Sequence, residues 1–156
     1  MYEFSTDPTP PPLSDEFLTR LRTLVAGMQA HTGEWGEWGG GEDVRLEDGR
    51  IAHQMPYSMP GPIPESAMEW LYESNRIFNF RWAEWDEGRE IFRQWTDATP
   101  AMLDHLTVRQ LLTAIARNDR FCEGAWMGMF EDGFAVPLFT RLLELEEHLA
   151  AGGSQP

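Results

Sequence analysis

The stretch TVRQLLTAIARN, residues 107–118, decides the fold class of this 156-residue chain. Its apolar residues recur at three- and four-residue intervals, the spacing of one buried helix face: Val108, Leu111, Leu112 and Ile115. Thr107 and Gln110 match a capping box, so we expect a helix that begins at Thr107 and ends near Asn118. This face is the most secure part of the predicted core.

The same spacing continues in both directions along the chain. It predicts helices over residues 14–30, 64–75, 82–96, 120–132 and 135–149, and a single turn over 101–105. Ser14 is a typical N-cap, and Gly133 is expected to end the helix over residues 120–132 as a left-handed C-terminal cap. Helical segments with almost no strand predict a mainly α fold: a single compact domain of about five to six helices around one core.

Two regions do not follow helical spacing. Residues 1–13 are rich in proline and are predicted to form a partly disordered leader, and residues 151–156 a flexible tail, on either side of a 14–150 domain. Residues 31–64 are rich in Gly, Trp and Pro and are predicted to be an irregular loop region. Four prolines between residues 51 and 64 exclude a central strand and leave room for at most a short edge strand.

Charge excludes several functions. The chain has 26 acidic residues against 12 basic ones, for a net charge of −14, and all the basic residues are arginine. Without lysine there is no P-loop or Schiff-base chemistry. The negative field disfavours direct binding to nucleic acids or anionic lipid, so we expect neither. The acidic residues are spread evenly, which indicates a solvated surface more than a DNA-like row of carboxylates.

No targeting or membrane signal is evident. The N-terminus lacks a signal peptide pattern, and the apolar stretches are far shorter than the roughly 20 residues of a membrane span. We therefore expect a soluble, cytoplasmic protein without membrane contact. The single Cys122 forms no internal disulfide, and we expect it to be a small buried apolar residue.

Two tryptophans interrupt the glycine-rich stretch 33–41. Trp35 and Trp38 are either anchored on the core or exposed as partner-binding residues of a loop. If the two tryptophans are exposed, they predict binding to a protein partner, and the acidity of the chain favours a partner with a basic surface.

The densest polar group lies at the junction 117–124. Arginine forks next to a helix start are suited to an anionic ligand. The candidate ligand-binding residues are Arg117, Asp119, Arg120 and Glu123, with Gln54 and Tyr57 if the fold brings them near. The structural alternative is that Asp119 caps the next helix and the arginines pair with Asp119 or Glu123. Gly124 and Gly128 are expected on one face of that helix, where another helix, or alternatively a ligand, approaches closely.

The sequence contains no recognisable catalytic or metal-binding motif. The four histidines are scattered without zinc-ligand spacing, and no nucleophile, dinucleotide or calcium motif occurs. We predict no catalytic residue, no metal and no cofactor.

Several stretches resemble a small helical domain family of unknown function found in bacteria and phages. They are Gln54–Tyr57 (QMPY), Phe80–Trp85 (FRWAEW), Leu111–Gly124 with the core RNDRFCEG, and Leu142-Leu143. The resemblance spans about residues 54–146. It implies no activity, but it implies that the junction 117–124 is a family feature, for folding or for function.

The sequence thus favours a non-enzymatic protein-binding module. The alternative is a small enzyme or sensor that binds an anionic metabolite at the Arg117–Glu123 junction. A third hypothesis is a DNA-mimic inhibitor.

Overall fold

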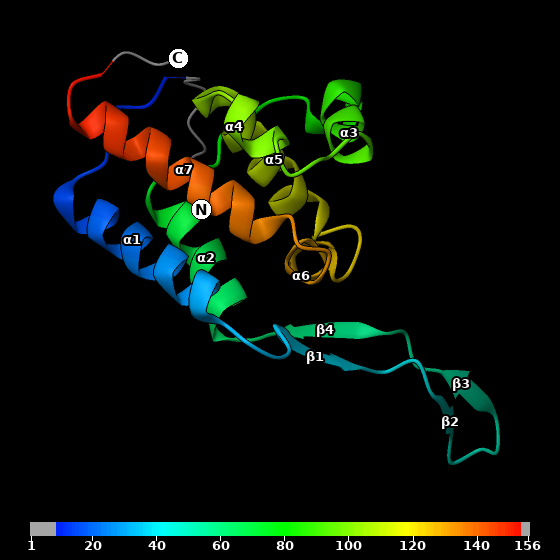
Figure 1. The fold of residues 1–156 in the computed structure, drawn as a ribbon. Coiled ribbons are helices and arrows are strands. Elements are labelled where there is room, and N and C mark those ends of the chain that lie inside the picture. Colours follow the sequence, from blue (N-terminus) through cyan, green and yellow to red (C-terminus); the bar gives the residue numbers. More distant parts are fainter. Residues whose placement is uncertain (1–8, 154–156) are drawn as a thin grey trace.

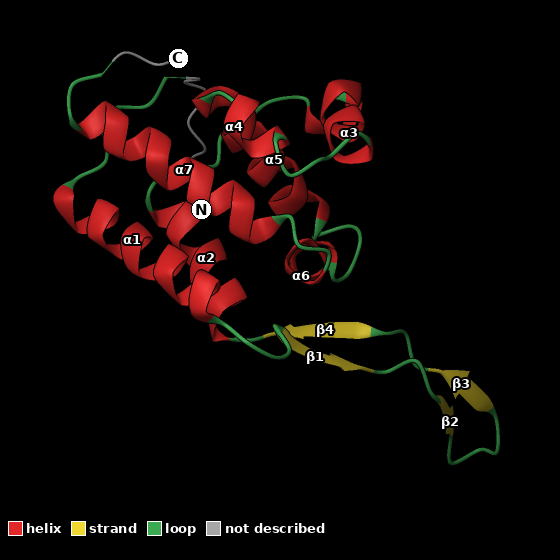
Figure 2. Ribbon diagram, viewed as in Figure 1, coloured by secondary structure: helices red, strands yellow, loops and turns green. Residues whose placement is uncertain are grey.

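A computed structural model describes residues 9–153 of the chain (Figure 1). Over this range helices dominate, and the strands are confined to one protruding region (Figure 2). The helices are α1 (Asp15–Ala30), α2 (Pro62–Glu73), α3 (Asp86–Arg93), α4 (Thr99–Met102), α5 (His105–Asn118), α6 (Ala125–Glu131) and α7 (Ala135–Ala150), with a 3-10 turn over Trp82–Glu84. The predicted mainly α fold class is confirmed.

The core lies between the longest helices. α1 packs beside α7 and α2, and α5 packs against α7. Val108, Leu111 and Leu112 are fully buried there, which confirms the apolar face predicted for residues 107–118. None of the described helices is long and apolar enough to cross a membrane.

The start of α5 differs from the sequence prediction because Asp104, the residue directly before the helix, is its N-cap. α5 begins at His105 rather than Thr107, because the Asp104 side chain accepts a hydrogen bond from the Thr107 backbone N–H at 2.7 Å. α1 begins as predicted, with the Ser14 hydroxyl accepting from the Phe17 N–H.

α6 is shorter than the predicted 120–132 helix. Gly124 has φ +86°, a left-handed conformation that ends the preceding turn, so α6 begins only at Ala125. The expectation that Gly124 and Gly128 share a helix face is therefore wrong for Gly124. Gly133, with φ +83°, is left-handed after α6 as predicted.

The predicted 82–96 helix is split. A 3-10 turn and Trp85, whose φ of −87° and ψ of 85° are not helical, precede α3, which ends at Arg93. Two ion pairs lie on the exposed side of α3, Asp86–Arg89 at 2.7 Å and Glu90–Arg93 at 3.1 Å.

Residues 36–60 form an antiparallel ribbon, which we call the arm. Its strands are β1 (Gly36–Gly39), β2 (Asp43–Arg45), β3 (Ile51–His53) and β4 (Tyr57–Pro60), and β1 pairs with β4 while β2 pairs with β3. The arm leaves the helical body between α1 and α2 and projects away from it (Figure 1). The expected limit of one short edge strand is thus too low, because every strand of a two-stranded ribbon is an edge strand that tolerates proline at its ends.

Both halves of the arm follow one register. Gly36 lies opposite Pro60 and Arg45 opposite Ile51, so the two sheets are parts of a single hairpin. The pairing breaks at Gly40 and Gly41, which both have positive φ. At the tip, Gly49 (φ +84°) donates its N–H to the Leu46 carbonyl and closes the turn.

The ends of the chain lie partly outside the described residues. Within the predicted leader, the Pro11 carbonyl accepts a hydrogen bond from Arg76 at 3.0 Å, and Leu13 packs against the core. The remainder of that leader, residues 1–8, and residues 154–156 of the predicted tail lie outside the described part of the chain.

Candidate functional site

The junction 117–124 joins α5 to α6, and its acidic residues have partners within the fold. Asp119 Oδ1 accepts a hydrogen bond from the Trp126 backbone N–H at 2.9 Å, so it caps α6. Glu123 Oε1 accepts from the Ser58 N–H at 2.9 Å and lies 3.3 Å from the Ser58 hydroxyl oxygen. Arg117 is half-buried at the end of α5, and Arg120 is exposed in the turn.

The junction holds the arm in place. The Trp38 ring lies over Gly124, where a Cβ would overlap it, and Trp38 Nε1 donates to Glu131 Oε1 at 2.8 Å. Together with the bond from Ser58 to Glu123, these contacts fasten β1 and β4 to the start and end of α6. Sequence reasoning predicted neither contact, because the partners are 65 and 93 residues apart.

Of the other predicted site residues, Trp35 packs on the helical body, whereas Gln54 and Tyr57 are exposed. Trp35 stacks on His31 with ring centroids 4.1 Å apart and lies 5.2 Å from the Phe130 ring, so it is packed on the helical body. Gln54 and Tyr57 lie exposed on the arm. The Tyr57 ring covers Gly39 on the opposite strand.

Exposed apolar side chains gather on the arm. Nine large hydrophobic residues are exposed in the described part of the chain. Two of them, Met102 and Phe121, lie outside the arm. The remaining seven define what we call the arm surface: Trp38, Val44, Leu46, Ile51, Met55, Tyr57 and Met59. Exposed apolar residues concentrated in this way mark interaction sites on soluble proteins.

The arm surface is surrounded by negative charge. Two acidic residues of the arm have partners within the arm: Asp48 pairs with Arg50 at 2.7 Å, and Asp43 lies 3.0 Å from His53. Between residues 34 and 61 the sequence has six acidic residues and two arginines, namely Glu34, Glu37, Glu42, Asp43, Glu47 and Asp48 against Arg45 and Arg50.

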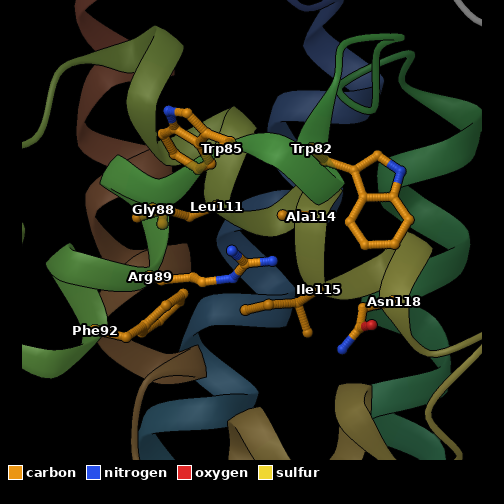
Figure 3. Close-up of a pocket in the computed structure, with 9 residues that line it drawn as sticks. All are labelled: Trp82, Trp85, Gly88, Arg89, Phe92, Leu111, Ala114, Ile115 and Asn118. Atoms are coloured by element: carbon orange, nitrogen blue, oxygen red, sulfur yellow. The ribbon is translucent and has the colours of Figure 1, made fainter.

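A cleft lies beside α5. We call it the aromatic cleft; it measures about 320 Å³ between the Trp82–Phe92 segment and α5 (Figure 3). Most of its lining residues are apolar or glycine, namely Trp82, Trp85, Gly88, Phe92, Leu111, Ala114 and Ile115. Its two polar side chains are those of Arg89 and Asn118. Its size and lining are those of a small-molecule site.

A charged cluster is sealed inside the body. Arg76 contacts both oxygens of Glu146, at 2.6 and 2.7 Å, and His105 Nε2 lies 2.6 Å from Glu146 Oε1; all three are buried. Burial alone would raise the pKa of Glu146. Hydrogen bonds from His105 and Arg76, together with their charges, outweigh burial and lower it. Because water and substrates have no access, the cluster is suited to holding α5, α7 and the Arg76 loop together.

No group of three or more potential metal ligands occurs within residues 9–153. Cys122, expected to be buried, is exposed in the turn before Gly124, because α6 begins too late to carry it into the core.

Comparisons with known proteins give one match. The model of a family of unknown function, DUF6508, matches residues 13–148. No curated protein and no solved structure matches the chain significantly.

Proposed function

The chain belongs to DUF6508, a family of unknown function, and we propose that this member is a protein-binding module that engages its partner through the arm. The observation that carries the proposal is the placement of the arm surface. Ile51 and Met55 have exposed fractions of 67% and 74%, and seven of the nine exposed large hydrophobic residues in the described part of the chain lie on the arm. A partner that covers these two side chains removes their apolar surface from water, which favours binding.

The shape of the arm supports the same function. β2 and β3 contact mainly each other and stand away from the helices (Figure 1). A two-stranded ribbon alone is marginally stable in water, so the distal half of the arm gains most from a surface on which to pack. Its two outer edges also leave backbone groups for strand pairing with a partner.

Charge indicates the kind of partner. With five acidic residues against two arginines, the arm complements a surface that carries basic residues around an apolar groove. Because this attraction acts between exposed charges, binding is expected to weaken as salt rises from about 0.05 to 0.5 M.

The structure also bears on the alternative of an anionic-metabolite site. Asp119 caps α6, and Glu123 accepts a hydrogen bond from the arm. Gln54 and Tyr57 lie on the arm itself. These roles favour the arm-binding proposal, in which the junction is the base of the binding element.

The test uses the full chain and three proteins: wild type, the double variant Ile51→Ser/Met55→Ser, and the control Met102→Ser. Met102 is 75% exposed on α4, outside the arm, so it matches Met55 in exposure. Partners captured by the wild type from the source cells are purified, and hydrogen exchange of each complex is measured.

We expect the double variant to lose the partner at least tenfold and the control to keep it, with exchange protection over residues 42–55. Thermal unfolding should be the same for all three proteins. Retention of every partner by the double variant, or protection confined to the helices, would contradict the proposal.

A further inference from the structure

We propose that the aromatic cleft binds a small, uncharged planar molecule, an aromatic amide or lactam of one or two rings. This site is independent of the arm, because none of its lining residues belongs to the arm. Two stretches singled out in the sequence, residues 80–85 and 111–124, converge at the cleft, although none of its lining residues was predicted as a site residue.

The aromatic walls of the cleft are held in position by their neighbours. A Cβ at Gly88 would overlap the Trp85 ring, so glycine there lets this indole lie against the backbone of α3. Trp85 also meets the Phe80 ring edge-on at 5.6 Å, and Trp82 packs on Phe121 at 6.0 Å. The two indoles stand on either side of the cleft (Figure 3). Half-buried indoles held in this way are suited to stacking on a planar ring.

One polar group in the cleft is available to a ligand. The Asn118 amide, at the end of α5, forms no side-chain hydrogen bond within the described residues. An amide has both donors and an acceptor in one plane. A ligand that carries an amide or lactam group can therefore exchange two hydrogen bonds with Asn118 while its ring contacts Trp82.

The charge balance favours a neutral ligand. The guanidinium of Arg89 lies between the two indoles (Figure 3), but it donates to Asp86 at 2.7 Å and to the Ala83 carbonyl at 2.9 Å. Its charge is thus matched by Asp86, and no other charged residue of the described chain lines the cleft. A carboxylate would find no unpaired cation among the lining residues, and an ammonium group would find no carboxylate there.

The experiment uses three probes of similar size with the full-length protein. Benzamide is planar, neutral and carries an amide; benzoate replaces the amide by a charge; and cyclohexanecarboxamide replaces the planar ring. Binding is measured by saturation-transfer NMR and by the change in tryptophan fluorescence. We expect benzamide to bind at least about tenfold more tightly than either analogue, since each analogue loses one class of contact.

Variants locate the site. Asn118→Ala should weaken benzamide binding about tenfold, and Trp82→Ala should abolish it, whereas the exposed Asn79→Ala, outside the cleft, should bind as the wild type does. Circular dichroism checks that each variant is folded. The proposal is overturned if wild type gives no benzamide signal, if all three probes bind equally, or if folded Asn118→Ala binds benzamide as strongly as Asn79→Ala.

Discussion

Glu146 shows how much depends on single residues in this protein. It is fully buried, yet its pKa is lowered, because His105 and Arg76 lie within 2.7 Å of its oxygens and their hydrogen bonds outweigh the effect of burial. Arg109 lies beside the cluster, donating to the Arg76 carbonyl at 3.1 Å and covering the Phe78 ring. Removing one member leaves the charge of another without its counterion in a place that water does not reach.

We predict that Glu146→Gln lowers the free energy of unfolding by about 3–5 kcal/mol, because the buried charge of Arg76 loses its partner. The neighbouring Glu147→Gln is the control. Glu147 pairs with Arg22 at 2.8 Å on the surface, so its loss should cost no more than about 1 kcal/mol. Urea unfolding at pH 7 measures both values, and equal effects would show that the buried cluster has no special weight.

The same residue predicts a pH dependence. The pKa of Glu146 is lower in the folded chain than its ordinary value of 4.5, so its contribution to stability is complete above that value. As pH falls through the folded-state pKa, the carboxylate is protonated and the contribution is lost. Unfolding free energy of the wild type should therefore decrease more steeply below about pH 4.5 than that of Glu146→Gln. Parallel curves would contradict this assignment.

At the scale of an element, the start of α6 links helix geometry to the arm. Gly124 needs its left-handed backbone to begin α6, and its missing side chain makes room for Trp38. Gly128 lies one turn further on, within the helix, and nothing lies within 4 Å of a Cβ built there. Two glycines four residues apart therefore have different physical reasons for their presence.

We predict that Gly124→Ala lowers the free energy of unfolding by about 1–3 kcal/mol, since it strains the backbone and pushes Trp38 away. Gly128→Ala should be neutral or stabilise the protein by up to about 1 kcal/mol, because alanine is the better helix former. Denaturant unfolding gives both changes, and hydrogen exchange over residues 36–39 reports release of the arm in the first variant only. If the two variants behaved alike, the assignment of Gly124 would fail.

At the scale of the whole molecule, the chain divides into a packed helical body and an arm that adds little to it. The core cluster is built from the helices, with Ile77 after α2 and Leu103 between α4 and α5, and it includes no residue of the arm. The arm is joined to the body by Trp38, Ser58 and the neighbouring backbone. Stability and binding surface are thus located in different parts of the molecule.

We predict that replacing residues 42–54 by a two-residue Asn-Gly turn leaves the free energy of unfolding of the body within about 1 kcal/mol of the wild type, because β2 and β3 contact mainly each other. The same deletion should abolish partner capture. Circular dichroism and thermal unfolding test the first expectation. A body that failed to fold would show that the distal arm is part of the core structure.

Much of the helical architecture is predictable from local sequence. The apolar spacing of residues 107–118, the N-cap at Ser14 and the left-handed Gly133 each depend on residues within one or two helical turns, and each is confirmed. The ribbon was missed because its pairing joins residues up to 24 positions apart, Gly36 with Pro60. The turn signal Asp48-Gly49 is the feature that would have indicated a hairpin.

Sequence alone thus determined the helical class, the negative charge and the exclusion of lysine chemistry, since these follow from composition and short-range periodicity. Tertiary structure decided that Trp35 packs on the body beside His31 and Phe130, and that the half-exposed Trp38 contacts Gly124 and Glu131. It also assigned Glu123 to the arm and placed Trp82, Trp85 and Asn118 around one cleft. The physical reason is that backbone preference is local, whereas burial and hydrogen-bond partners depend on which faces pack together across the whole chain.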